Sequence, residues 1–205
     1  GRTIPVHTKG TLIEHAGEKL ALAIFRDISA TMESRQRIEF LATHDPLTGL
    51  PNRSLLYDRI QHALARSDRE PEPFALLFID LDNFKDLNDT LGHDQGDQLL
   101  LQAATRIQNC VRVADTTARL GGDEFTVLVA GADRATAAAT AQRIVDELAA
   151  PFMLDDQARN TVTASIGISL YPQDGADRRA LMKYADEAMY RAKAVGNSYR
   201  FHTEL

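Results

Sequence analysis

The chain is short of cysteine, of tryptophan and of long apolar runs. Cys110 is the only cysteine, so no disulfide can form within the chain, and tryptophan is absent. No apolar run approaches the roughly 20 residues of a membrane-spanning helix, and no signal peptide is visible. This cysteine usage fits a reducing compartment. We therefore expect a cytoplasmic location, and the sequence leaves open whether a longer protein is attached to a membrane.

Basic residues are also in deficit. The 205 residues contain 23 Lys and Arg against 29 Asp and Glu, which gives a formal net charge of −6. This balance disfavours a broad basic face for nucleic acid, and a polyphosphate ligand would need a metal ion or a few well-placed cations. The length suggests one domain with extra sequence or two small ones. Because the chain begins with Gly1 and not with Met, we expect it to be part of a longer protein.

The first part of the chain is predicted to form a hairpin and a helix. Residues 1–29 alternate like two strands, with HAGEK as the turn and LALAIF as the second strand. Two strands alone do not make a stable domain, so we interpret this segment as the end of a larger unit. Residues 30–44 form a charged connection that is helical over 30–43. This helix is either a solvated linker or a signalling helix that pairs with a second copy.

The denser pattern of residues 45–205 predicts one further domain, which opens with the turn-rich segment DPLTGLPN. Apolar periodicity predicts helices over 53–67, 97–112, 134–149 and 178–195, strands over 74–81 and 160–171, a hairpin over 117–130, and a final strand, SYRFH. Because hairpins and crossovers are mixed, we predict an α+β fold with a mainly antiparallel central sheet flanked by helices.

Acidic side chains stand where two of these strands end. Asp80 closes the apolar run FALLFID, where a bare buried carboxylate would be costly, so it must face solvent or a partner. The hairpin supplies Asp123 and Glu124. If the hairpin lies beside strand 74–81, these three acids and Asp82 could converge, and converging carboxylates suit Mg²⁺ or Mn²⁺. Taken alone, Gly-Gly-Asp-Glu would more often be a polar turn, and only the combination with Asp80 favours a site.

Several segments together resemble one family, the GGDEF diguanylate cyclases, which takes its name from the motif at 121–125. DPLTGLPNR (45–53), FIDLDNFKDLNDTLGHDQGDQLL (78–100), RVAD (112–115) and ADEAMYRAKAVG (185–196) are similar to its opening segment, nucleotide-binding stretch, regulatory product site and last helix. The resemblance covers about residues 45–203 in the expected order. It implies the fold that this family shares with nucleotide cyclases and with the palm of polymerases.

The resemblance also implies a reaction, in which two GTP molecules form cyclic di-GMP and two pyrophosphates. A 3′-hydroxyl attacks an α-phosphate with the help of Mg²⁺ or Mn²⁺. By resemblance, Asp80, the backbone carbonyl of Leu81 and Asp123 bind metal, and Glu124 is a further carboxylate at the site. Asp123 matches the proton-accepting position, and Glu124 and Lys85 are expected to take part in catalysis, with Lys85 stabilising charge in the transition state.

The substrate-binding residues are likewise implied by the resemblance. Those matching family positions near the nucleotide are Phe84, Lys85, Asn88, His93, Asp97, Gly121, Gly122 and Lys193. Asn88 and Asp97 match the guanine readers, a pairing that suits the guanine edge. Without the resemblance, Asn88 would be read as a turn residue, Asp97 as an acid favoured by the helix dipole, and His93 as structural.

The chain departs from the family pattern after its last predicted helix. Lys193 matches a lysine that contacts the terminal phosphates. The family often continues with Gly-Arg-Asn or Gly-Lys-Asn, whereas this chain has Gly196-Asn197-Ser198. The second basic phosphate contact is therefore in doubt, and we expect weaker GTP affinity without loss of activity.

Arg112 and Asp115 match the family's inhibitory product-binding site, and arginine suits phosphates and base edges. The plainer alternative is an ion pair between residues three apart at a helix end. Arg119 could support either the inhibitory or the catalytic site.

Each subunit of a diguanylate cyclase holds one GTP, so the resemblance implies a homodimer. Residues 1–29 are similar to the final strands of a PAS sensor domain, which implies an upstream sensor, and an EAL phosphodiesterase domain could follow. The alternative function is an inactive module that binds GTP or cyclic di-GMP and regulates an attached EAL domain. The retained Asp80, Asp123 and Glu124 favour catalysis.

Overall fold

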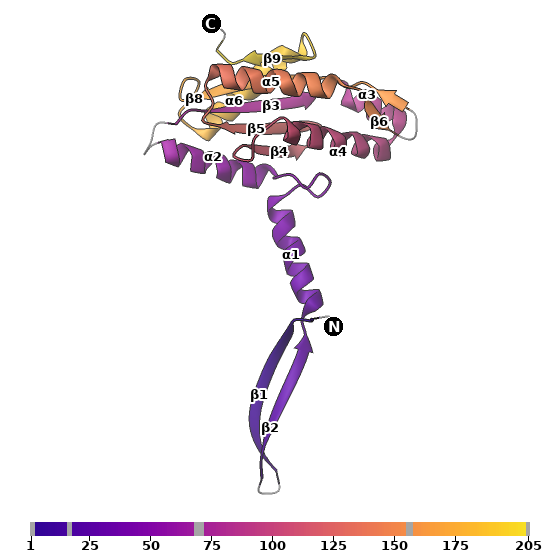
Figure 1. Cartoon of the computed structure of the whole chain (residues 1–205), viewed down its shortest axis with the longest axis vertical. Coiled ribbons are helices and arrows are strands. Elements are labelled where there is room, and N and C mark those ends of the chain that lie inside the picture. The colour runs from indigo at the N-terminus through magenta and orange to yellow at the C-terminus, as the bar shows by residue number, and fades with distance from the viewer. Residues whose placement is uncertain (1–2, 16–17, 68–71, 155–157, 204–205) are drawn as a thin grey trace. The chain divides into compact units, whose positions relative to one another are not determined.

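The computed structural model describes residues 3–15, 18–67, 72–154 and 158–203. The chain divides into two compact units, residues 1–42 and 43–205. In the first unit, β1 (Val6–His15) and β2 (Glu18–Asp27) pair in antiparallel fashion and lead into α1 (Ser29–Thr43), as Figure 1 shows. The strands and the helix match the sequence prediction. The expected HAGEK turn includes Ala16 and Gly17, which lie outside the described residues.

The β1–β2 hairpin exposes apolar side chains on both of its faces. Leu12 is 75% exposed and Phe25 is 67% exposed, and the pairing of Thr8 with Phe25 places these two on one face. Ile24, which is 59% exposed, pairs with Lys9 and points to the other face. A two-stranded sheet with apolar residues on both sides is marginal by itself. The interpretation of this hairpin as the end of a larger unit stays a prediction.

The second unit is built on a five-stranded sheet in the order β4-β5-β3-β8-β9. These strands are β3 (Phe74–Leu81), β4 (Thr116–Gly121), β5 (Glu124–Ala130), β8 (Ala164–Tyr171) and β9 (Ser198–Phe201). Only the β8–β9 pair is parallel among the described strands of this sheet. The predicted mainly antiparallel sheet is therefore confirmed, and a short β6 (Phe152–Leu154) and β7 (Ala158–Asn160) form a separate ribbon.

Helices cover both faces of this sheet (Figure 1). They are α2 (Arg53–Ser67), α3 (Phe84–Leu91), α4 (His93–Asn109), α5 (Arg134–Ala149) and α6 (Arg178–Lys193). The predicted helices over 53–67 and 134–149 have these bounds, whereas α4 begins four residues earlier than predicted. Helix α3 and the β6–β7 ribbon were not predicted, because neither is long enough to show a clear apolar period.

The alternation of β3 divides the core into two layers. Phe74, Leu76 and Phe78 pack in a cluster with residues of α2 and α6. The intervening Ala75, Leu77, Ile79 and Leu81 pack in the larger cluster with α3, α4 and α5. All eight residues of β3 are buried, as expected for a central strand. The same alternation places Asp80 on the side of the sheet that α2 and α6 cover.

Gly167 sets how closely α6 approaches the sheet. A Cβ atom at this position of β8 would lie 1.9 Å from the carbonyl oxygen of Ala185 and 2.1 Å from the backbone nitrogen of Met189. The backbone of α6 therefore rests directly on the strand, which only glycine permits. Among the described residues, no helix is both long enough and apolar enough to cross a bilayer.

Candidate active site

Strand β3 brings Asp80 between two neighbouring strands at the end of the sheet. Asp80 pairs with Glu124 of β5 on one side and with Ser165 of β8 on the other. Its side chain is only 8% exposed. Burial raises the pKa of the Asp80 carboxyl, and the charges of Asp123 and Asp82 raise it further, whereas Lys193 lowers it. A carboxylate in such a place needs a cation.

Lys193 supplies that cation from the last residue of α6. Its Nζ lies 2.8 Å from Oδ1 of Asp80. At this distance the ammonium and the carboxylate form an ion pair. Burial would lower the pKa of the Lys193 ammonium, but Asp80, Asp123 and Asp82 raise it. Lys193 therefore remains charged and is 40% exposed, within reach of a solvent-side ligand.

Glu124 and Asp123 stand at the tip of the β4–β5 hairpin, and both are half-buried. Burial raises the pKa of Glu124, the charges of Asp80 and Asp123 add to this, and Arg53 of α2 opposes it. The backbone carbonyl of Asp123 accepts the N–H of Leu81 at 3.4 Å. The strand pairing thus places the backbones of Asp80, Asp123 and Glu124 at the same end of the sheet. The predicted convergence of these side chains with Asp82 on one metal ion stays a prediction.

The chemistry of this end of the sheet fits a hard divalent cation. The buried carboxylate of Asp80 has the Lys193 ammonium on one side, and the carboxylates of Asp123 and Asp82 lie close enough to raise its pKa. No group of three or more described His, Cys, Asp or Glu side chains is gathered closely enough to hold a metal by itself. Magnesium commonly takes one or two carboxylates and completes its shell with water and substrate phosphates. The assignment of Asp80, Asp123, Glu124 and the Leu81 carbonyl to such an ion stays a prediction.

The two glycines of the hairpin adopt conformations that favour glycine. Gly121 has φ of 140° and Gly122 has φ of 55°, and both are exposed. Nothing lies within 4 Å of a Cβ built on either residue, so the space above them is open. Arg119 fixes the turn, because its Nε and Nη2 donate to the Gly122 carbonyl at 3.0 and 2.8 Å.

Helices α3 and α4 carry most of the other predicted substrate residues. Asn88 of α3 and His93, the first residue of α4, make a side-chain hydrogen bond of 2.9 Å between Nδ2 and Nδ1. A Cβ at Gly96 would lie 2.1 Å from Oδ1 of Asn88, so the Asn88 amide occupies space that is free only because residue 96 is glycine. Sequence reasoning missed Gly96, because it stands one residue before the helix predicted over 97–112, and only the earlier start of α4 places it inside a helix.

The remaining predicted substrate residues lie on the same two helices. Phe84 is buried at the start of α3, and its ring lies 3.4 Å from a Cβ built at Gly96. Lys85, in the first turn of α3, and Asp97, in the second turn of α4, are exposed. Their roles toward a nucleotide stay predictions.

The hydrogen-bond partners of Asp82 are not the acids of the hairpin. Its carboxylate accepts from the hydroxyl groups of Thr163 and Ser165 and from the backbone N–H of Asn197. Asp82 is therefore a structural neighbour of the acidic centre, and the idea that it joins the metal ligands is not supported by these contacts.

Arg112 and Asp115 lie in a turn after α4, away from the acids. The backbone N–H of Arg112 donates to Oδ2 of Asp115 at 2.8 Å, and Oδ1 accepts from Ala130 N–H at 3.1 Å. The contact between the two is thus not the side-chain ion pair of the plainer alternative. The Arg112 side chain is exposed and borders a cavity of about 320 Å³ with Arg59 of α2 and Thr117 of β4.

Comparison with known proteins identifies the family of this domain. Residues 42–198 match the family described as "Diguanylate cyclase, GGDEF domain". The chain is 47% identical over 174 residues to the bifunctional diguanylate cyclase/cyclic di-GMP phosphodiesterase MucR of Pseudomonas aeruginosa, which covers 84% of this chain and 25% of MucR.

Two solved structures are similar in both sequence and fold. The GGDEF domain of TpbB from Pseudomonas aeruginosa has a TM-score of 0.76 and 42% identity, with 78% of this chain and 94% of that one covered. The GGDEF domain of DgcB from Caulobacter crescentus, solved in complex with c-di-GMP, has a TM-score of 0.73 and 28% identity, with 80% and 94% covered. The chain spans well under half the length of the curated relatives that it matches, 25% in the case of MucR. The chain belongs to the GGDEF domain family of diguanylate cyclases.

Proposed function

We propose that this domain is an active diguanylate cyclase, which condenses two GTP molecules into cyclic di-GMP and releases two pyrophosphates. The observation that carries the proposal is the acidic centre, in which a buried Asp80 is paired with Lys193 and lies beside Glu124 and Asp123. Membership of the family supports the reaction, and the preserved Gly121-Gly122-Asp123-Glu124 hairpin supports catalysis over mere binding.

The residues divide the work of the reaction. Mg²⁺ or Mn²⁺, bound by Asp80, Asp123 and the Leu81 carbonyl, would acidify the 3′-hydroxyl and neutralise charge on the transferring phosphate. Asp123 accepts the proton of that hydroxyl, with Glu124 as a second carboxylate beside it. Lys193 and Lys85 face the phosphates as cations. Gly121 and Gly122 leave the backbone open to close approach by a phosphate.

Residues of α3 and α4 select guanine. Asn88 presents its amide oxygen toward Gly96 and its amide nitrogen toward His93. Asp97 follows Gly96 and offers a carboxylate to the N1–H and N2–H₂ donors of guanine. Phe84 is buried at the start of α3, and its ring lies close to Gly96 of α4.

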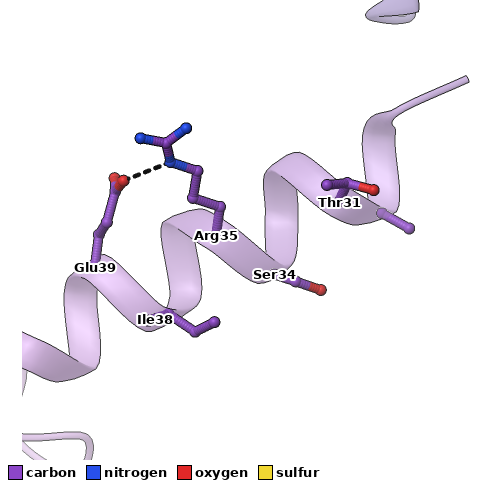
Figure 2. Close-up of a pocket in the computed structure, with 6 residues that line it drawn as sticks. Thr31, Ser34, Arg35, Ile38 and Glu39 are labelled. Carbon is purple, nitrogen blue, oxygen red and sulfur yellow. Dashed lines mark hydrogen bonds and ion pairs between the residues drawn. The ribbon is translucent and has the colours of Figure 1, made fainter.

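Two copies of the chain are required, because one domain holds one GTP. Helix α1 offers a seam for such a pair: Thr31, Ser34, Ile38 and Leu41 recur at the three- and four-residue spacing of a coiled coil. Figure 2 shows Thr31, Ser34 and Ile38 along the helix, with Arg35 and Glu39 joined by a 2.8 Å ion pair beside them. Ile38 is 67% exposed, and these residues border a depression of about 690 Å³.

Product inhibition at Arg112 is the regulatory part of the proposal. The cavity beside Arg112 and Arg59 presents two guanidinium groups, which suit the phosphates of cyclic di-GMP. An upstream PAS sensor domain remains the proposed source of the signal, supported by the exposed apolar faces of the β1–β2 hairpin.

The test is to incubate the chain with GTP and Mg²⁺ and to separate the products by chromatography. Asp123→Asn removes the proposed base with little change of shape, and Asp146→Asn, an exposed acid on α5, is the matched control. We expect cyclic di-GMP from the wild type and from the control but not from Asp123→Asn. Equal product from Asp123→Asn would refute the assignment of the acid.

The second candidate is a regulatory module that binds GTP or cyclic di-GMP without turnover, attached to an EAL phosphodiesterase domain. The observation that favours keeping it is a 39% identity over 170 residues to PdeR of Escherichia coli, which is named only as a cyclic di-GMP phosphodiesterase. It predicts no product at concentrations that force dimers, together with tight binding of GTP or cyclic di-GMP by calorimetry.

A further inference from the structure

Asp82 is a junction between two segments that are distant in the sequence. Its Oδ2 accepts from Thr163 Oγ1 at 2.6 Å and from the backbone N–H of Asn197 at 3.1 Å, and its Oδ1 accepts from Ser165 Oγ at 2.7 Å. Its own N–H donates to the Thr163 carbonyl at 2.8 Å. Thr163 and Ser165 lie at the start of β8, and Asn197 lies between α6 and β9. One carboxylate thus ties both segments to the end of β3.

The tie to Asn197 reaches Lys193 through a short and well-bonded turn. Lys193 ends α6 only four residues before Asn197. The N–H groups of Val195 and Gly196 both donate to the Ala192 carbonyl, at 3.0 and 2.9 Å, so this turn is closed by its own hydrogen bonds. Fixing the backbone of Asn197 therefore fixes the end of the helix that carries the Lys193 ammonium.

We propose that Asp82 is a positioning residue, which holds Lys193 against Asp80 by fastening the α6–β9 turn and the start of β8 to β3. The three groups that contact its carboxylate are all donors, so an acceptor-only side chain is what the position requires. The inference rests on the proposed function to the extent that Lys193 serves the GTP phosphates. It assigns Asp82 no contact with substrate or metal.

A double-mutant cycle separates this role from a general contribution to stability. Asp82→Asn, Lys193→Ala and the double variant are titrated with the α,β-methylene analogue of GTP, which cannot undergo transfer at the α-phosphate. If Asp82 acts through Lys193, Asp82→Asn weakens binding about tenfold alone, as loss of a hydrogen bond to a charged group implies. In the Lys193→Ala background, the further loss should be under about twofold. An equal loss in both backgrounds overturns the proposal.

A second readout does not depend on nucleotide at all. Amide hydrogen exchange at Asn197 reports the Asp82 contact directly. We expect the Asn197 amide to exchange about 10- to 100-fold faster in Asp82→Ala than in the wild type, because the variant loses a hydrogen bond to a carboxylate. Unchanged exchange would overturn the junction.

Two controls keep the exchange experiment interpretable. Thr163→Ser keeps the hydroxyl, so the Asn197 amide should exchange as slowly as in the wild type. Thr163→Val removes the hydroxyl, so the Asn197 amide should exchange faster. This pair of variants gives an answer even if Asp82→Ala is poorly folded. Asp146→Asn removes an exposed charge elsewhere and should change nothing. If the wild type makes no cyclic di-GMP, the proposed function fails, whereas the exchange data still decide the role of Asp82.

Discussion

Arg119 and Asp45, 74 positions apart, form an ion pair of 2.9 Å between Nη1 and Oδ1, with side chains only 10% and 15% exposed. The same guanidinium holds the Gly122 carbonyl, and the backbone N–H of Arg119 donates to Pro51 at 3.0 Å. The segment that opens the domain is thereby joined to the hairpin that carries Asp123. Asp45 and Arg119 therefore help to fix where the hairpin lies.

Asp45→Asn should lower the free energy of unfolding in a pH-dependent way. Burial acts to raise the pKa of Asp45, but hydrogen bonds from Thr48 and the contact with Arg119 lower it overall. A lowered carboxyl pKa stabilises the fold above the unfolded value of about 3.9, and this contribution is lost as the pH falls through the folded value.

We therefore expect Asp45→Asn to cost about 2 kcal/mol at pH 7, and less as the pH falls to 3. Urea unfolding at the two pH values measures the difference. Asp58→Asn, an exposed acid of α2, is the control and should be nearly neutral at both. An equal cost of Asp45→Asn at both values would contradict the ion-pair explanation.

Gly96→Ala should impair GTP binding without destabilising α4. Alanine favours a helix by up to about 1 kcal/mol over glycine, but its Cβ would meet the Asn88 amide oxygen. We expect the GTP KM to rise about tenfold and the selectivity for guanine to fall, as the loss of about one hydrogen bond implies. Steady-state kinetics with thermal unfolding measures both effects. Gly10→Ala, where the nearest atom is at 3.8 Å, should leave both unchanged.

Thr126→Val should stabilise the domain. Thr126 is fully buried between the sheet and the α2–α6 layer, and its hydroxyl is without a partner among the described residues. Replacing it by an apolar group of equal shape removes a desolvation cost of about 1 kcal/mol. Chemical unfolding tests this against Ser169→Ala, whose hydroxyl donates to Leu181 at 2.8 Å and whose loss should destabilise. A destabilised Thr126→Val would show that the hydroxyl has a partner.

Ile38→Glu should weaken self-association if α1 forms the proposed seam. Charges placed on both copies would meet at the apolar row of the helix. We expect a lower dimer fraction by analytical ultracentrifugation, and cyclase activity that recovers at high protein concentration. Met32→Glu, the same change on another side of α1, is the matched control, and equal effects of the two variants would exclude a defined seam.

Asn197→Arg should lower the GTP KM if the missing basic contact limits affinity. Asn197 has φ of 43°, a left-handed conformation that asparagine tolerates, so arginine would carry a strain on the order of 1 kcal/mol. We expect KM to fall about fivefold, from an exposed charge contact of about 1 kcal/mol. Asn197→Gly adapts to the same backbone without adding charge and should leave KM unchanged. No improvement by arginine would refute the expected deficit.

The sequence predicted the elements with strong apolar periods and the acids at their ends. Strand 74–81 and the helices over 53–67 and 134–149 were found because burial imposes a regular spacing on long elements. The sequence could place Asp80 beside Glu124 only on the condition that their strands pair, because strand pairing is not visible in one sequence. The strand order β5-β3-β8 shows that these strands are neighbours.

Side-chain tertiary contacts were beyond reach of the sequence. Asp82 stands two residues after Asp80 and looks like a fellow ligand, yet its partners come from positions 163, 165 and 197. Arg119 likewise gave no sign that it bridges Asp45 and Gly122. Such contacts depend on loops meeting in space, for which no local pattern exists. The regulatory role of Arg112 and the PAS interpretation of residues 1–29 stay predictions.

The glycine at position 167 has a consequence for how the domain accommodates substrate. At Gly167 the backbone of α6 lies directly against β8 with no side chain between them, so we expect the helix that bears Lys193 to be held fixed at this point. The connection between α3 and α4 is exposed from Leu91 to Asp94. If the proposed roles of α3, α4 and α6 hold, we expect adjustment to an incoming nucleotide to come from α3 and α4, while the end of α6 stays in place.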